Sequence, residues 1–200
     1  HKLKEGDEVV WSIEATNKSE IIFFTSMQQA YKARLYDFDD SKASVLGDYL
    51  PAKLGMDEGE TPLYALLPGD YKGSMVVAFQ NGKAARFSLQ SFETKTNRRR
   101  LSGAYSDKSP AVGFFFPVDD ETEITMFSTA NRALTFRAGM LDIKATRSTQ
   151  GVQTMVLRGK HTVTRACRTE DANLLDQARY RCRSIPSIGA LLTEDQLKFE

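Results

Sequence analysis

Three polar segments of the chain each carry basic residues, and these residue types are suited to binding an anion. The segments cover residues 36–48, 90–102 and 139–150. In each of them Lys or Arg accompanies Ser, Thr, Asn or Gly, and hydroxyls, backbone N–H groups and cations together are the groups that contact phosphate. The stretch Thr96–Gly103 is the strongest single basic site because it holds three consecutive arginines. The pattern indicates a polyanionic partner.

The net charge of +1 conceals an uneven distribution of charge along the chain. Residues 1–70 hold seven Lys/Arg and thirteen Asp/Glu, whereas residues 71–200 hold twenty Lys/Arg and thirteen Asp/Glu. A local excess of cations attracts polyanions through its long-range field and through counterion release. Charge alone leaves a second interpretation open, which is a solvated surface that is uneven and has no partner.

Other candidate chemistry is weaker. The acidic run Asp119–Glu123 could bind a metal, but a charge run without a buried shell favours a solvated turn between repeats. His161 is the one internal histidine and stands beside a turn, which favours exposure over catalysis. An enzyme with a site in a central channel, such as a glycosidase, would need convergent carboxylates, so we give it little weight.

The two cysteines also argue against a metal centre. Cys167 and Cys182 form no C-x-x-C pair and no cluster with histidine, which argues against zinc. Cys182 alternates with Arg181 and Arg183, so we expect it to point into a core. Two sparse thiols suit a reducing cytoplasm. The longest apolar run, Ala111–Val118, is far too short to cross a bilayer.

Three strand-turn-strand units must position the basic segments. They cover Ile21–Leu35, Met75–Leu89 and Ile124–Arg137, with equivalent turn residues Gln28, Gly82 and Asn131. These turn residues are 54 and 49 residues apart. A period near fifty residues that is built of strands predicts an all-β, propeller-like array of four-stranded blades.

Each unit is followed by a second half. Residues 49–68, 101–118 and 151–167 each predict a further pair of strands, with a Gly-acidic turn at residues 56–60 in the first pair. We predict one domain over residues 1–200, with repeats at about 20–70, 71–119 and 120–169.

The two ends predict partial blades at 1–19 and 170–192. The first is based on the strand Val9–Ile13, and the second on a strand at Arg179–Arg183. Joined together, they would give about four blades, with the incomplete first blade completed by the C-terminal strands, and closure would protect strand edges. The alternative is that a strand pair precedes His1. The only helix we expect is a short turn near Thr193.

The repeat resembles the C-terminal DNA-wrapping domain of the A subunit of bacterial type IIA topoisomerases, gyrase and topoisomerase IV. The three strand-turn-strand units carry the resemblance, together with Leu3–Glu8 and Thr146–Val152. The resemblance implies a beta-pinwheel, in which blades exchange strands with their neighbours and DNA bends around a basic perimeter. The Gln-Arg-Arg-Gly-Gly-Lys-Gly signature of gyrase has no copy here, and Thr96–Gly103 is a degenerate counterpart. The opening segment and the low blade count favour topoisomerase IV over gyrase.

The resemblance implies duplex DNA binding and bending that is independent of sequence and steers DNA geometry for strand passage. We expect outward-facing cations on strands and loops to contact the DNA. They are Lys32, Arg34, Lys83, Arg86, Lys95, Arg98, Arg99, Arg100, Arg132, Arg137, Lys144, Arg147, Arg181 and Arg183. The alternative is a propeller-like scaffold for protein interactions without DNA binding, because fold does not dictate function.

The resemblance also implies what this domain does not do alone. The catalytic tyrosine, the metal-binding acidic cluster and the ATP site of the family lie in other domains or subunits, so no catalytic residue and no cofactor is expected here. ATP and magnesium belong to the rest of the holoenzyme. The implied partners are double-stranded DNA, the ATPase B subunit, and the catalytic domain of the same polypeptide, in the cytoplasm at the nucleoid and with no membrane.

Overall fold

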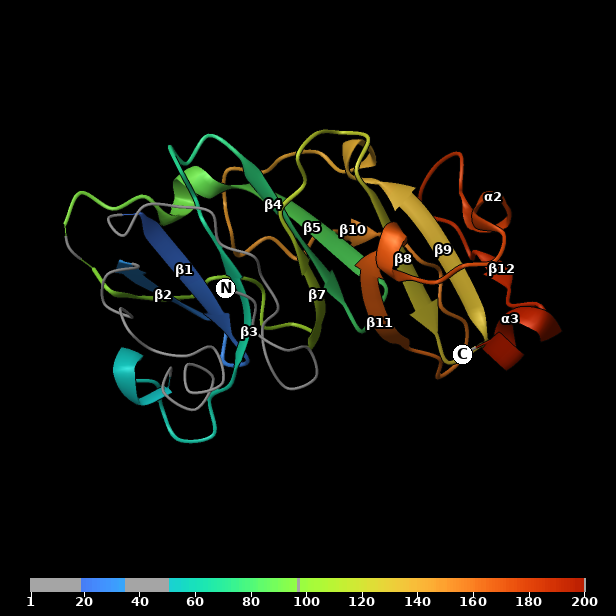
Figure 1. Cartoon of the computed structure of the whole chain (residues 1–200), viewed down its shortest axis with the longest axis horizontal. Helices are drawn as coiled ribbons and strands as arrows, with labels where there is room; N and C mark the ends of the chain where they lie inside the picture. The colour runs from blue at the N-terminus through green and yellow to red at the C-terminus, as the bar shows by residue number, and fades with distance from the viewer. Residues whose placement is uncertain (1–18, 35–50, 97, 200) are drawn as a thin grey trace. The chain divides into compact units, whose positions relative to one another are not determined.

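The computed structural model describes residues 19–34, 51–96 and 98–199 (Figure 1). Within these ranges the chain forms three four-stranded antiparallel sheets, in the orders β3-β1-β2-β6, β7-β4-β5-β10 and β11-β8-β9-β12. The strands are β1 Glu20–Thr25, β2 Gln29–Arg34, β3 Pro62–Leu66, β4 Ser74–Phe79, β5 Lys83–Ser88, β6 Arg100–Ser102, β7 Ala111–Phe115, β8 Glu123–Ser128, β9 Arg132–Arg137, β10 Val152–Gln153, β11 Val163–Arg168 and β12 Ala190–Leu191. The prediction of four-stranded β units is confirmed, and three of them lie in the described residues.

The three predicted hairpins are present in the same register. The innermost Cα partners are Phe24 and Ala30, Ala78 and Ala84, and Phe127 and Ala133. The predicted turn residues all lie in the left-handed region, with φ of 55° at Gln28, 85° at Gly82 and 56° at Asn131. Gly and Asn adopt this conformation more readily than other residues, which is why they mark such turns.

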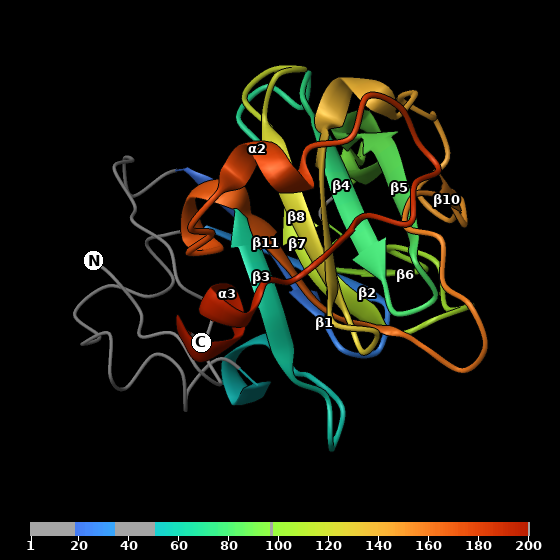
Figure 2. The same cartoon turned by 90° about the vertical axis from the view of Figure 1, so that its right-hand side faces the viewer.

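The fourth strand of each sheet returns from a later part of the chain. β6 follows β5 in sequence but pairs with β2, and β10 follows β9 but pairs with β5 (Figure 2). Each returning segment also donates to the carbonyl oxygen of the hairpin turn residue. The donors are Ala104 N to Gln28 O at 2.9 Å, Thr154 N to Gly82 O at 3.0 Å, and Leu192 N to Asn131 O at 2.8 Å. The strand exchange implied by the resemblance is therefore observed within the described sheets.

The chain divides into two compact units, each with its own core. Unit 1 contains the β3-β1-β2-β6 sheet and includes residues 89–106, and its core groups Ile21, Phe23 and Tyr31. Unit 2 contains the other two sheets, which share one apolar cluster that includes Val76 and Ile124. Apolar burial of this kind supplies the main driving force for folding.

A buried carboxylate organises the predicted acidic turn of unit 1. Glu60 is 5% exposed and accepts hydrogen bonds from the Thr25 hydroxyl, from Tyr31 OH at 2.7 Å and from Asp57 N at 2.9 Å. Burial and the hydrogen bond to Glu60 raise the pKa of Tyr31 well above its ordinary value. The turn thereby holds β3 against the first hairpin, because the Glu60 carboxylate binds donors from the hairpin and from the turn at the same time.

The C-terminal segment differs from the prediction. The expected strand Arg179–Arg183 begins as helix α2, Gln177–Tyr180, because the Asp176 side chain accepts from Arg179 N and caps the helix. β12 completes the third sheet by pairing with β9, rather than completing a first blade. The partial blade predicted at 1–19 lies almost wholly outside the described residues, so blade count and ring closure stay predictions.

Helices are more numerous than predicted, although all are short. The helical turn expected near Thr193 is confirmed as α3, Glu194–Phe199, but residues 51–54 are helical where a strand was expected. Short 3-10 turns follow the hairpins, including η2 at Leu89–Phe92. In the second half at 151–167, the strand expected over Val152–Leu157 is reduced to the two residues of β10. No helix in the described ranges is long and apolar enough to cross a membrane.

Candidate nucleic-acid interface

Each returning linker brings an exposed cation beside the second strand of the preceding hairpin. Arg99 O accepts a hydrogen bond from Lys32 N at 2.7 Å, and Lys144 N donates one to Arg86 O at 2.9 Å. Arg181 forms an isolated parallel β-bridge with Thr135. Arg99, Lys144 and Arg181 are all exposed. Two of the three predicted linkers, 90–102 and 139–150, therefore place an exposed cation at equivalent positions of their sheets, as the sequence predicted. The first predicted linker, 36–48, lies outside the described residues, and Arg181 takes the equivalent position in the third sheet although it belongs to no predicted linker.

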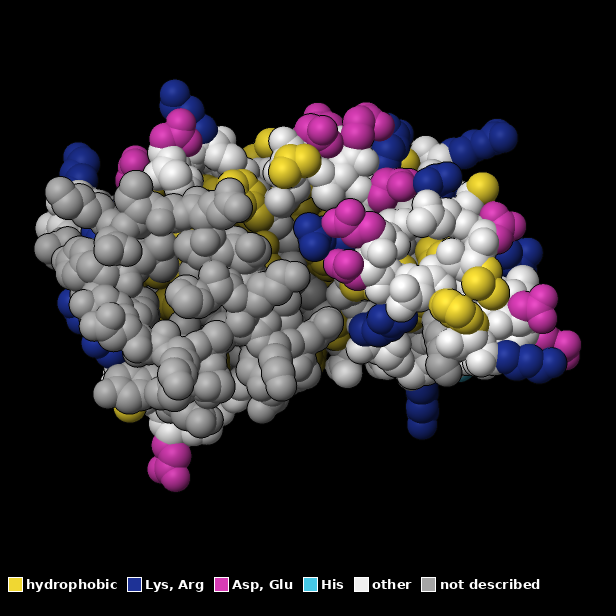
Figure 3. All heavy atoms as spheres, viewed as in Figure 1, with side chains coloured by type: hydrophobic (Ala, Val, Ile, Leu, Met, Phe, Trp, Pro, Cys, Tyr) yellow, Lys and Arg dark blue, Asp and Glu magenta, His cyan; other side chains and the backbone are white. Residues whose placement is uncertain are grey.

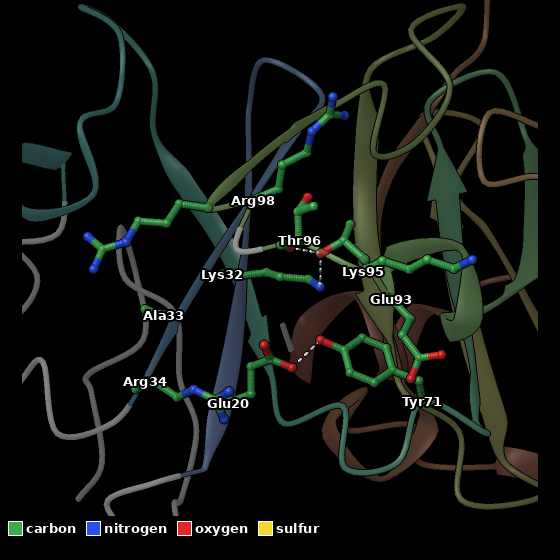
Figure 4. Close-up of a pocket in the computed structure, with 11 residues that line it drawn as sticks. Glu20, Lys32, Ala33, Arg34, Tyr71, Glu93, Lys95, Thr96 and Arg98 are labelled. Carbon is green, nitrogen blue, oxygen red and sulfur yellow. Dashed lines mark hydrogen bonds between the residues drawn. The ribbon is translucent and has the colours of Figure 1, made fainter.

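The most basic loop, residues 94–99, precedes β6 in unit 1. Lys95, Arg98 and Arg99 are exposed, and among the described residues none of the three forms an ion pair. Figure 4 shows Lys95 and Arg98 extending away from the loop backbone. These three cations have the exposure that contact with a polyanion requires.

Four other predicted cations are neutralised by carboxylates. The pairs are Arg86 with Asp120 at 2.8 Å, Arg137 with Glu121 at 3.3 Å, Arg181 with Glu123 at 2.7 Å, and Arg100 with Asp57 at 2.6 Å. The hydrogen bond to Glu123 raises the pKa of Arg181, and the hydrogen bond from Arg100 lowers the pKa of Asp57. The face of unit 2 drawn in Figure 3 accordingly interleaves basic and acidic side chains.

The acidic run Asp119–Glu123 forms the turn that was predicted between β7 and β8, and the sequence missed its role. Three of its carboxylates bind three of the expected DNA-contacting arginines: Arg86, Arg137 and Arg181. The turn therefore does more than stay solvated, since its carboxylates hold these arginines in ion pairs. Within the described ranges no group of three or more Asp, Glu, His or Cys side chains could hold a metal ion.

Two strand cations do not face outward as expected. Lys32 is 8% exposed and Arg86 is 6% exposed, and the hairpin register makes their positions equivalent. Both are held by side chains from distant segments: Lys32 by Thr94 and Arg86 by Ser74 and Asp120. Buried cations are tolerated only with such partners. The register also makes Arg137 equivalent to Arg34 rather than to Arg86, because Thr135 takes the third buried position.

The remaining predicted cations differ in exposure. Arg34 ends β2 and is exposed, as is Arg183, while Lys83 and Arg132 are half-buried at the starts of β5 and β9. Arg132 donates to Gly189 O at 3.1 Å. Arg147 is half-buried, and burial lowers its pKa. These residues lie on several elements, whereas Lys95, Arg98 and Arg99 share one loop.

His161 and Cys182 lie where the sequence predicted, one exposed beside a turn and the other against a core. His161 is exposed and its Nδ1 lies 2.9 Å from the Thr129 hydroxyl. Cys182 is half-buried and packs against the apolar cluster of unit 2, while Arg181 and Arg183 on either side are exposed. Burial raises the pKa of the Cys182 thiol, which keeps it protonated.

No family model matches the chain. The A subunit of DNA gyrase from Thermotoga maritima is 31% identical over 99 residues, which are 49% of this chain and 12% of that protein. The solved C-terminal domain of DNA topoisomerase IV superimposes with a TM-score of 0.61 at 17% identity, over 76% of this chain and 47% of that one. The solved C-terminal domain of E. coli ParC superimposes with a TM-score of 0.55 at 12% identity, over 77% of this chain and 63% of that one.

The gyrase subunit is similar to this chain in sequence, and the two domain structures are similar to it in fold. The chain spans only part of each protein it matches, and the matches include both gyrase and topoisomerase IV. The resemblance is confirmed: the chain is similar in sequence to a DNA gyrase A subunit, and similar in fold to the C-terminal domains of topoisomerase IV and ParC.

Proposed function

We propose that this chain binds duplex DNA without sequence specificity, as the accessory C-terminal domain of a type IIA topoisomerase A subunit. The observation that carries the proposal is the set of exposed cations in the basic loop, Lys95, Arg98 and Arg99, together with the exposed linker cation Lys144 of unit 2. Exposed cations in polar loops suit phosphate contacts. No helix of the described residues exceeds six residues, so none is suited to reading bases in the major groove.

The finer parts of the proposal follow the family. The DNA bends along the cations, at an elastic cost of several kcal/mol that a series of phosphate contacts offsets. The domain steers DNA geometry for a topoisomerase of the topoisomerase IV type. Its partners in the cytoplasm are the ATPase B subunit, together with the catalytic domain of its own polypeptide. The catalytic tyrosine, ATP and magnesium belong to those partners.

Binding should be strongly dependent on salt. Each phosphate contact contributes about 0.9 to the slope of log K against log salt, so several contacts should make binding collapse between about 50 and 200 mM salt. Electrophoretic mobility shifts with duplexes of increasing length, over a salt series, measure this directly. An affinity that depends neither on salt concentration nor on duplex length would contradict the proposal and favour a protein-interaction scaffold.

Neutralising part of the acidic turn should tighten duplex binding. Glu121→Gln with Glu123→Gln releases Arg137 and Arg181 for phosphate, so affinity should rise roughly three- to tenfold and the salt slope by about one to two. Asp120 is left intact because its partner Arg86 is buried, and an unpaired buried charge would destabilise the fold.

The matched control removes the same two charges elsewhere in unit 2. Asp107 and Asp142 are exposed and join no ion pair among the described residues. Their replacement by Asn changes net charge equally and releases no arginine. Equal affinity of the two double variants in the mobility-shift titration would mean that the turn does not compete with DNA.

A further inference from the structure

A hollow of about 720 Å³ in unit 1 is lined by several cations (Figure 4). Its lining residues are Glu20, Lys32, Ala33, Arg34, Tyr71, Glu93, Thr94, Lys95, Thr96, Arg98 and Arg99. The lining includes five Lys/Arg and two carboxylates, an excess of three positive charges. Such an excess in a concave site attracts anions of high charge density.

Lys32 forms a fixed floor for this hollow. Its Nζ lies 3.2 Å from Thr94 Oγ1 and 5.0 Å from the centre of the Tyr71 ring. The Thr94 hydroxyl in turn donates to Thr96 O at 2.8 Å, so the lysine sets the shape of the basic loop. The Thr94 hydroxyl and the Tyr71 ring thus hold the ammonium group in place at the base of the hollow.

One of the two carboxylates is already engaged. The Tyr71 hydroxyl donates to Glu20, and Figure 4 shows the two side chains turned toward each other. This contact orients the aromatic ring under Lys32, with Tyr71 itself held at a φ of 64°. The floor is therefore positioned by neighbours that come from β1 and from the segment before β4.

The rim of the hollow is built of long, charged side chains at exposed positions. Lys95, Arg98 and Arg99 come from the loop and line the hollow together with the buried Lys32. Arg supplies a planar fork of donors for phosphate oxygens and Lys supplies a point charge, so the set can surround a tetrahedral oxyanion from several directions.

We propose that this hollow is a phosphate-oxyanion site, in which Lys32 is the floor and Lys95, Arg98 and Arg99 close over the anion. The phosphate comes from a free polyphosphate or from the DNA backbone. Where the source is DNA, the inference rests on the proposed function. A compact polyphosphate suits the site best, because it brings several negative charges into one concave space.

Titration calorimetry of the chain with sodium tripolyphosphate tests the site, with orthophosphate as the weaker probe. Lys32→Met keeps the length and packing of the side chain, and Arg98→Gln with Arg99→Gln changes only exposed positions. Each variant should weaken tripolyphosphate binding at least about tenfold, since each removes one or two of the five cations in the lining. Lys160→Gln, an exposed cation of unit 2 outside the linkers, is the control and should leave binding unchanged.

The source of the phosphate is resolved by adding duplex DNA. If tripolyphosphate displaces the duplex from the wild-type chain but not from the double variant Arg98→Gln with Arg99→Gln, one site is shared by both sources of phosphate. Tripolyphosphate binding without any duplex binding supports the site and overturns the proposed function. Duplex binding without tripolyphosphate binding, or an equal loss of tripolyphosphate binding in the Lys160→Gln control, overturns the site and leaves duplex binding standing.

Discussion

Glutamate in place of Lys95, Arg98 and Arg99 together should weaken duplex binding at least about 100-fold at about 0.15 M salt. The variant removes three exposed cations and adds three repulsive charges at the most basic loop of the chain. The salt slope should fall by about three, because each lost phosphate contact removes about 0.9. Mobility-shift titrations over a salt series measure both quantities.

Arg100 is left out of this variant although the sequence groups it with Arg98 and Arg99. Arg100 donates to Asp57 and Gln29 and belongs to β6, so its reversal would disturb the first sheet. The matched control reverses Arg158, Lys160 and Lys198, which are exposed and outside the three linkers. Equal loss of affinity in both triple variants would mean that net charge alone drives binding, and the assignment of this loop would fail.

Gly151→Ala should lower the free energy of unfolding by about 4 kcal/mol. Gly151 has a φ of 78° directly before β10, and a Cβ there would lie 2.7 Å from Ala85 N and 2.5 Å from the carbonyl carbon of Ala84. Backbone atoms of a central strand cannot move aside cheaply, so the exchanged strand would detach from β5. Urea unfolding followed by circular dichroism measures the change.

The control for this variant separates backbone strain from crowding. Gly159 has a φ of 61°, but a Cβ there would meet nothing within 4 Å. Gly159→Ala should therefore cost only about 1 kcal/mol. A Gly151→Ala variant no less stable than Gly159→Ala would contradict the close packing of β10 on β5.

The third sheet repeats this arrangement, and the first does not. Gly189 precedes β12 with a φ of 77°, and a Cβ there would lie 2.5 Å from Ala133 O. In the first sheet, the position is taken by Arg100, which pairs with Tyr31 as a regular strand residue. The exchanged strand is accordingly longer there, three residues instead of two.

The hairpins were predictable because two local signals coincide. Continuous apolar runs such as Met75–Phe79 indicate strands buried on both faces, and Gly82 or Asn131 marks a left-handed turn. The period follows from these signals alone. The positions of the basic linkers relative to the hairpins were predictable for the same reason.

The exchanged strands were not predictable residue by residue. β10 and β12 are two residues long and carry no apolar pattern, so only long-range pairing defines them. The burial of Lys32 and Arg86 was hidden because Thr94 and Asp120 are 62 and 34 residues away from them. In contrast, Asp176 offered a local capping signal for α2 that the alternation around Cys182 obscured.

The returning fourth strand has a consequence for how this chain could gain or lose length. A cut at the apparent repeat boundary, between residues 119 and 120, would strip β5 of β10 and expose an unpaired edge. Excision of one whole period, from 75 to 123, would instead join β3 to β8 and let β10 pair with β2. The unit that can be duplicated or deleted without leaving an unpaired strand is therefore one period of the sequence. That period supplies three strands to one sheet and the exchanged fourth strand to the sheet before it.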